Sequence, residues 1–329
     1  MILTFIYIFF KLAILCVVLV KKYRFFFATD DNYAPFLAVA INSMLDNASK
    51  EYFYKIFVLT TDLDEKLKNQ ILIEKTENSS IEFVSLKDEL DKMSEIFHLR
   101  DYYSKETYYR FFIARLFPQY EKILYLDCDI IVLGDVSKLY NTDISDKYVA
   151  AAPEEVMAVV NTFGEYVEKT LDIQRDKYFN AGILLINAKK FRENNIEQQF
   201  VDLSKEYVFA LTQDQDYLNV ICKNNIKYLD LGWNKTSFEN PAFTDELKII
   251  HYKIHHKPWH YTGIKYEEHF WKYAEKTGFH NLLKEMLASY SDEEKKRDEI
   301  MYQKMLDLAI KDSNDPNNYK NSMDRLNSK

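Results

Sequence analysis

The stretch at residues 122–132 (KILYLDCDIIV) decides how this sequence is interpreted. A mostly apolar run of strand type leads into Asp127, Cys128 and Asp129, and a second apolar run follows. Side chains alternate between the two faces of an extended chain, so the two aspartates point the same way. Two carboxylates that converge at the end of a strand suit a hard divalent cation, which prefers oxygen ligands. The alternative is that both aspartates simply end a strand and face water.

The sequence before this stretch alternates between apolar runs and amphipathic segments. We predict strands at residues 23–28, 55–60 and 81–85, and helices at residues 35–45, 64–74 and 107–117, the last ended by Pro118. Strands that alternate with helices predict an α/β fold with one doubly wound, mostly parallel sheet of Rossmann type. Ligands of such sheets bind outside the carboxyl ends of the strands, where Asp30 and the aspartate pair are expected to lie.

The pattern continues after residue 148 without a linker. We predict strands at residues 149–152, 183–187 and 247–250, and helices at residues 191–208 and 213–222. The chain looks helical from about residue 266, and residues 291–329 read as a charged surface helix with a frayed tail. These patterns predict three parts: an apolar segment at residues 1–22, one catalytic domain at residues 23–280, and a helical, charged C-terminal extension at residues 281–329.

Composition excludes several classes of protein. Of the 329 residues, 47% are hydrophobic and 29% charged, which fits a globular chain with a substantial core. Only 6 residues are glycine and no glycine-rich phosphate loop occurs, so a bound phosphate would depend on metal and side chains. The net charge of −8, without a basic stripe, argues against nucleic acid as a partner. Three scattered cysteines favour a reducing compartment.

The N-terminus allows more than one interpretation. Residues 1–20 are almost wholly apolar, apart from Lys11, and their length is close to a bilayer span of ~20 residues. Positive charges follow at Lys21, Lys22 and Arg24, so residues 2–20 as an anchor would leave the rest of the chain in the cytoplasm, attached to the inner face of the membrane. A cleaved signal peptide fits poorly, because no small-residue cleavage site follows. A third interpretation is that the true start lies further along the chain and that this stretch is upstream sequence without a function.

Five segments in a fixed order carry a resemblance to a known family. They are FATDDNY from residue 27 onward, LYLDCD, FNAGILLIN, QDQDYLN, and HY followed by KPWH. Together they resemble glycosyltransferase family 8, the retaining enzymes that include glycogenin and the bacterial lipopolysaccharide galactosyl- and glucosyltransferases. The resemblance covers about residues 25–279. It implies a fold of the GT-A type and a UDP-sugar as the donor substrate.

The resemblance also implies which residues bind the metal ion and the donor. Asp127, Asp129 and His251 match the metal ligands of the family, and two carboxylates with one imidazole suit Mn²⁺ better than Mg²⁺, which stays the alternative. Further residues match positions that contact the uridine, the donor sugar or the diphosphate: Ala28, Asp30, Asn32, Tyr33, Asn180, Ala181 and Lys257. An ordinary turn and helix cap at residues 30–32 is the structural alternative.

Catalytic roles follow from the same resemblance. Arg110 matches an arginine that contacts sugar and phosphate, Asp214 and Gln215 match the pair near the anomeric carbon, and Glu154 matches an acidic residue on the acceptor side. An amide is a poor nucleophile, so either a front-face route or Asp216 as a nucleophile stays open. The chain departs from the family at Ile254, where a glycine is usual next to the diphosphate.

The resulting hypothesis is the transfer of glucose or galactose from a UDP-hexose to a glycan or glycoprotein, with retention at the anomeric carbon. A related metal-dependent nucleotidyltransferase is the alternative among enzymes. A degenerate sugar-nucleotide-binding protein is the alternative without catalysis, and Ile254 makes it worth testing.

Overall fold

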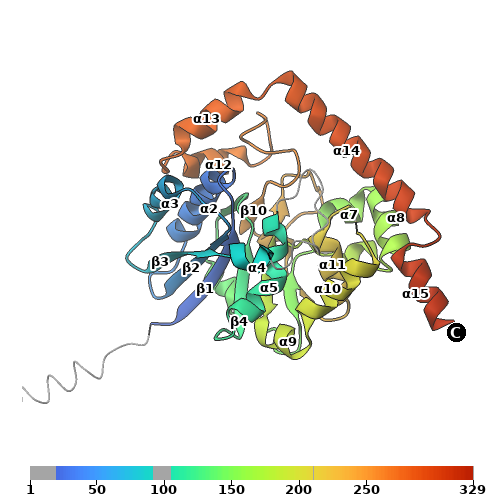
Figure 1. Ribbon diagram of the computed structural model, residues 1–329. Coiled ribbons are helices and arrows are strands. Elements are labelled where there is room, and N and C mark those ends of the chain that lie inside the picture. Colours follow the sequence, from blue (N-terminus) through green and yellow to red (C-terminus); the bar gives the residue numbers. More distant parts are fainter. Residues whose placement is uncertain (1–19, 92–104, 210, 329) are drawn as a thin grey trace, which may run out of the picture.

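The computed structural model describes residues 20–91, 105–209 and 211–328. At its centre lies a seven-stranded sheet with the order β3-β2-β1-β4-β7-β6-β8 (Figure 1). Its strand β7 runs antiparallel to both neighbours, whereas the other pairings are parallel. The doubly wound, mostly parallel sheet is therefore confirmed. The strands are β1 Lys22–Ala28, β2 Phe53–Thr60, β3 Ser79–Ser85, β4 Lys122–Leu126, β6 Val149–Ala151, β7 Ile183–Asn187 and β8 Ile226–Tyr228.

A second, three-stranded sheet lies beside the carboxyl end of β4. It has the order β5-β10-β9 and consists of β5 Ile130–Val132, β10 Ile249–His251 and β9 Lys235–Thr236. Strand β10 runs antiparallel to β5 and places His251 opposite Ile130. The amide of Tyr252 donates to the carbonyl oxygen of Asp129 at 2.9 Å, which extends this pairing by one residue. The small sheet therefore brings a distant segment of the chain against the two aspartates.

Helices cover both faces of the large sheet. Two hydrophobic clusters result, one containing Phe25 and the other containing its neighbour Phe26, as expected for a strand that is buried on both faces. The helices are α2 Ala34–Asp46, α3 Glu65–Leu72, α4 Lys87–Asp91, α5 Tyr109–Leu116, α6 Val136–Tyr140, α7 Glu155–Val159, α8 Asn161–Thr170, α9 Ala188–Glu193, α10 Ile196–Glu206, α11 Asp214–Cys222, α12 Glu267–Ala274, α13 His280–Ser289, α14 Asp292–Ser313 and α15 Tyr319–Asn327.

Two expectations from the sequence are wrong. The helix predicted at residues 191–208 is divided into α9 and α10, because Asn195 adopts a left-handed conformation with a φ of 51°. The frayed tail is instead the helix α15, whose cap Asn318 also donates from Nδ2 to the carbonyl oxygen of Lys169 at 3.1 Å. In Figure 1, α13 and α14 run in turn along one side of the molecule, from α12 to α8.

The predicted apolar segment lies almost wholly outside the described residues, which begin at Val20. Among the helices of the described part, none is long and apolar enough to cross a membrane. The anchor at residues 2–20 therefore stays a prediction.

A buried ion pair fixes α7 to the small sheet. Lys235 Nζ lies 3.0 Å from Glu155 Oε2, and the two side chains are 0% and 3% exposed. The same carboxylate accepts bonds from the backbone amide and the hydroxyl of Thr236, and from Asn240. Because Glu154 precedes Glu155 in the chain, this pair also sets where Glu154 lies.

We expect Lys235→Met to lower the free energy of unfolding by about 3–5 kcal/mol, because Glu155 would stay buried without its cation. Urea denaturation measures this change. Lys248→Met is the matched control, since Lys248 pairs at 3.6 Å with Asp230, which is 69% exposed, and such pairs contribute about 0–1 kcal/mol. Equal losses in the two variants would contradict the structural role given to the buried pair.

Candidate functional site

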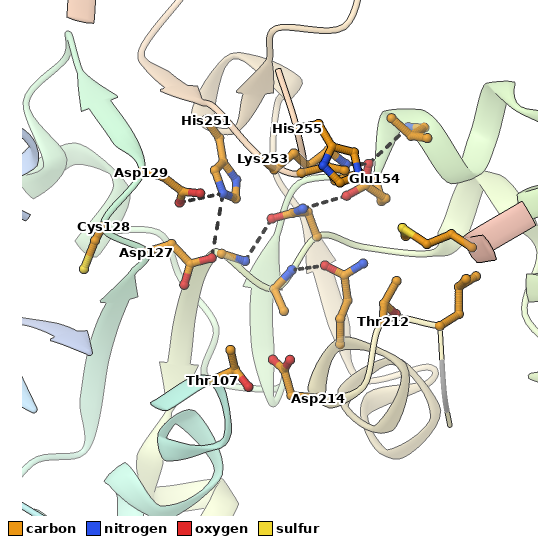
Figure 2. A pocket seen from close by; sticks show the side chains of 18 of the residues that line it. Thr107, Asp127, Cys128, Asp129, Glu154, Thr212, Asp214, His251, Lys253 and His255 are labelled. Atoms are coloured by element: carbon orange, nitrogen blue, oxygen red, sulfur yellow. Dashed lines mark hydrogen bonds and ion pairs between the residues drawn. The ribbon is translucent and has the colours of Figure 1, made fainter. Parts of the chain in front are cut away.

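A cleft with a volume of about 730 Å³ opens at the carboxyl ends of β1 and β4. Figure 2 shows its side chains, with Asp127, Asp129 and His251 turned toward one another and Glu154 and Lys253 across from them. Most of the predicted site residues line this cleft: Ala28, Asp30, Tyr33, Arg110, Asp127, Asp129, Glu154, Asn180, Ala181, Asp214, Gln215, His251 and Lys257. The exceptions are Asn32 and Asp216, which are not among its lining residues.

Asp127, Asp129 and His251 form a cluster that could hold a metal ion. Each offers one ligand atom, and these atoms lie within 4.8 Å of one another. His251 Nε2 is 3.2 Å from Asp129 Oδ1 and 3.7 Å from Asp127 Oδ2. Two carboxylates and one imidazole form a donor set that accepts Mn²⁺ and similar divalent ions.

A chain of amide groups selects the tautomer of the His251 ring. The backbone N–H of Gly182 donates to Asn180 Oδ1 at 2.8 Å, which leaves that oxygen as an acceptor for Asn234 Nδ2, also at 2.8 Å. Asn234 Oδ1 then faces His251 Nδ1 at 3.0 Å and must accept its proton. The unprotonated nitrogen of the neutral ring is therefore Nε2, the atom that faces both aspartates. The donor set thus fits a metal ion.

Gly182 leaves room for this cluster. A Cβ atom at this position would lie 2.4 Å from His251 Cε1 and 2.5 Å from Asp127 Oδ2. The residue directly precedes β7, and its carbonyl oxygen accepts a bond from the amide of Asp127 at 2.8 Å. A side chain here would therefore displace two of the three candidate ligands.

Lys257 brings a buried positive charge to the same cluster. Its Nζ lies 2.7 Å from Asp129 Oδ2 and 3.3 Å from the hydroxyl of Tyr33. Burial disfavours the charged form of Asp129, but the positive charge of Lys257, to which a protonated His251 adds before a metal ion binds, outweighs it, so the pKa of Asp129 lies below the usual range. Asp129 is therefore ionised and available as a ligand at neutral pH.

The segment after β1 forms a turn beside the cleft. Asp30 Oδ1 accepts a bond from the backbone amide of Tyr33 at 2.8 Å, which closes the turn directly before α2. Asn32 is exposed, and its Nδ2 lies 3.4 Å from Asp30 Oδ2. Tyr33 is 39% exposed and borders the cleft, so its ring is accessible to a planar ligand. The expected turn is thus present, but it supplies no side-chain cap to α2, and it presents Asp30 and Tyr33 to the cleft.

Arg110 connects the metal cluster with α11. Its guanidinium lies 3.2 Å from Asp127 and 3.1 Å from Asp214, and it donates to the carbonyl oxygen of Ala181 at 2.5 Å. Burial raises the pKa of Asp214 to about 7, although the charge of Arg110 acts in the opposite direction. Gln213, directly before Asp214, has a φ of 48°, a strained backbone of a kind that often occurs at functional sites.

Gln215 and Asp216 have different surroundings. Gln215 lines the cleft, and its side-chain oxygen accepts a bond from the amide of Ala181 at 2.9 Å. Asp216 is completely buried and accepts bonds from the hydroxyls of Tyr166 at 2.9 Å and Tyr178 at 2.7 Å. The structure therefore places Asp216 beneath the cleft rather than in it, because these hydroxyls hold its carboxylate in the core.

Glu154 is held by neighbours on all sides. Its carboxylate accepts bonds from Asn180 Nδ2 at 2.6 Å and from the amide of Val156 at 3.1 Å, and it pairs closely with Lys253. Burial acts to raise the pKa of Glu154, but Lys253 outweighs that effect and holds it below the ordinary value.

Ile254, the departure from the family pattern, has a left-handed backbone that a glycine would adopt more readily, with a φ of 60°. Its side chain is 37% exposed and lines the cleft, and a β-branched residue in this conformation is strained.

The comparisons with known proteins agree with this geometry. The model of glycosyl transferase family 8 matches residues 24–263, so the chain belongs to this family. It is 31% identical over 244 residues to a Haemophilus influenzae protein named as a glycosyltransferase, covering 71% of this chain and 72% of that protein. It is 25% identical to the lipopolysaccharide 1,3-galactosyltransferase of Salmonella typhimurium, covering 74% of each.

A solved structure supports the fold. The apo structure of the bifunctional glycosyltransferase WbbM aligns with a TM-score of 0.69 and 26% sequence identity, over 82% of this chain. The aligned part spans 52% of that chain, about half its length. The GT-A type of fold is therefore confirmed, and the chain is a glycosyltransferase.

Sequence reasoning did not single out several residues of the site. Gly182 lies within the quoted FNAGILLIN segment, and a glycine at the start of a strand is a signal of close approach. Asn234 follows a short 3-10 helix and has no motif that would mark it. From α14, the cleft is lined by Met301, Lys304, Met305 and Leu308, although the predicted surface helix suggested no part in the site.

We expect Gly182→Ala to weaken Mn²⁺ binding at least about tenfold, because its methyl group would push against His251 and Asp127. Titration followed by the electron paramagnetic resonance of free Mn²⁺ measures the affinity. Gly134→Ala is the control, since a Cβ there would meet Lys248 Cβ at an ordinary 3.4 Å. Equal affinities in the two variants would show that the ion does not bind at this cluster.

Proposed function

We propose that the chain transfers a hexose, glucose or galactose, from a UDP-sugar to a glycan or glycoprotein, with retention at the anomeric carbon. The observation that carries the proposal is one cleft in which Asp127, Asp129 and His251 converge beside the cations Lys257 and Arg110. Such a set suits a diphosphate, which carries negative charge and binds through metal and cations. The galactosyltransferase among the relatives supports a hexose as the transferred group.

Each side chain has a role in this proposal. Asp127, Asp129 and His251 would hold Mn²⁺, with Mg²⁺ as the alternative, and the ion would neutralise charge as UDP departs. The turn around Asp30 and the ring of Tyr33 would bind the uridine, together with Ala28 and Asn32, which lie in the same segment. Lys257, which pairs with Asp129, would also bind the diphosphate. Arg110, Asn180 and Ala181 would line the donor sugar.

The surroundings of the carboxylates favour a front-face reaction. Asp214 already pairs with Arg110, Gln215 carries an amide, and Asp216 lies beneath the cleft. In the front-face route the bond between the anomeric carbon and the diphosphate oxygen breaks as the acceptor oxygen attaches from the same side. The acceptor proton passes to the departing phosphate oxygen. Gln215 would then contact the sugar without forming a bond to it, and Glu154 would accept a hydrogen bond on the acceptor side.

For the site of action we propose the cytoplasm, with residues 2–20 attached to the inner face of the membrane. The positive charges at Lys21, Lys22 and Arg24 support this orientation.

The test is UDP release by the full chain from UDP-glucose and UDP-galactose, with Mn²⁺, with Mg²⁺ and with a chelator. We expect metal-dependent release from one of the two donors, and loss of at least about 100-fold in Asp129→Asn, because the ion would lose a charged ligand. When a sugar acceptor is added, nuclear magnetic resonance of the glycoside that forms would show the retained anomeric configuration. Lys248→Met serves as a control outside the cleft.

Three results would count against the proposal. Full activity in the presence of the chelator would contradict the proposed role of the metal ion. UDP binding without any release would favour a degenerate binding protein, and consumption of nucleoside triphosphates would favour a nucleotidyltransferase.

A further inference from the structure

The cleft continues beyond the proposed donor site onto an apolar surface. We define this apolar acceptor wall by six lining residues: Val156 and Met157 of α7, Phe163 of α8, and Met301, Met305 and Leu308 of α14. The three residues of α14 are spaced four and three apart, so they lie on one face of the helix. Met301, Met305 and Leu308 are partly buried, whereas Ile300 and Ile310 of the same helix are 47% and 51% exposed. Val156, Met157 and Phe163 are buried, so the accessible part of the wall lies mainly on α14.

The helix α14 is fixed to the site and is therefore part of the cleft. Its Asp298 accepts bonds from the hydroxyls of Tyr261 at 2.8 Å and Tyr290 at 2.7 Å, and it lies 3.2 Å from His255 Nδ1. His255 belongs to the loop that carries Lys253 and Lys257. Further along, Ala309 is completely buried in the core. Two separate attachments thus hold the apolar face of α14 at the cleft.

The acceptor must occupy the part of the cleft that the donor leaves free. The metal cluster, Lys257 and Arg110 form the charged end, where the diphosphate would bind. An acceptor hydroxyl that approaches the donor sugar next to Glu154 and Gln215 would have the rest of its molecule over the apolar acceptor wall, because α7 begins directly after Glu154. Sugar hydroxyls gain little from methionine and leucine side chains, whereas alkyl groups gain from contact with them.

We propose that the apolar acceptor wall binds an apolar aglycone, so that the acceptor is a sugar carried on a hydrocarbon group. This inference rests on the proposed transferase function, because it names the class of acceptor for the same cleft. Methionine suits the role, since its flexible, polarizable side chain adapts to chains of different shape. Lys304, which also lines the cleft, lies on α14 between Met301 and Met305 and adds a charge at the border of this wall.

The first experiment compares octyl and methyl glycosides of the same sugars as acceptors for the full chain. Below the micelle concentration of the octyl glycosides, we expect kcat/KM to be at least about tenfold higher for the octyl than for the methyl compound, because burial of two methylene groups suffices for that ratio. In the double variant Met301→Gln/Met305→Gln we expect the octyl-to-methyl ratio to fall toward one. Ile300→Gln/Ile310→Gln is the control on the same helix and should keep the ratio.

The second experiment separates the failure of this inference from the failure of the transferase function. Saturation-transfer nuclear magnetic resonance with octyl glucoside detects contact of the alkyl protons with the protein, without any turnover. We expect the alkyl signal to weaken in the methionine double variant and to persist in the isoleucine control. If UDP release fails while this pattern holds, the apolar site stands and the transferase proposal falls.

Two outcomes would overturn the inference itself. One is UDP-sugar turnover with equal kcat/KM for octyl and methyl glycosides, or with a glycopeptide preferred over both. The other is an alkyl signal that is the same in the methionine variant and the isoleucine control, which would place the contact elsewhere on the protein.

Discussion

The structure of the site depends on the register between β5 and β10. In this pairing His251 lies opposite Ile130, and the amide of Tyr252 donates to Asp129, so one short ladder brings together residues more than a hundred positions apart in the chain. A shift by one residue would turn His251 to the other face of the strand and separate it from both aspartates. The buried apolar residues Ile249 and Ile250 oppose such a shift, because it would exchange their surroundings as well.

The electrostatics of the cleft follow from that convergence. Burying Asp129 with a histidine alone would be costly, and Lys257 offsets the charge while Arg110 does the same for Asp127 and Asp214. Neutral amides then continue the network from His251 through Asn234 and Asn180 to Glu154, so the metal cluster and the acceptor side are joined by hydrogen bonds. The site is thereby held in place before any ligand binds, which reduces the cost of ordering it.

Local patterns predicted six of the seven strands of the large sheet, because these are apolar runs such as the one before Asp127, and most of them are followed by a helix. They missed β8, which is short and carries Lys227 between Ile226 and Tyr228. The same patterns placed Asp127 and Asp129 correctly, since both flank a strand end. Local patterns alone could not show that His251 lies beside these aspartates. That expectation came from the resemblance of the ordered motifs to the family. Local patterns also failed where tertiary contacts decide: Asn195 breaks a helix, Asp216 is withdrawn among tyrosines, and α14 lines the cleft. Asn234 has an ordinary sequence context, and its role follows from position alone.

The central claim is that Asp127, Asp129 and His251 bind a divalent ion that takes part in holding UDP. Calorimetric titration of the full chain with UDP, in Mn²⁺ and in a chelator, tests it most directly. We predict that UDP binds at least about tenfold more tightly with Mn²⁺, an effect of about 1.4 kcal/mol or more, because metal and nucleotide would share one site. Equal affinity for UDP in Mn²⁺ and in the chelator would contradict the claim.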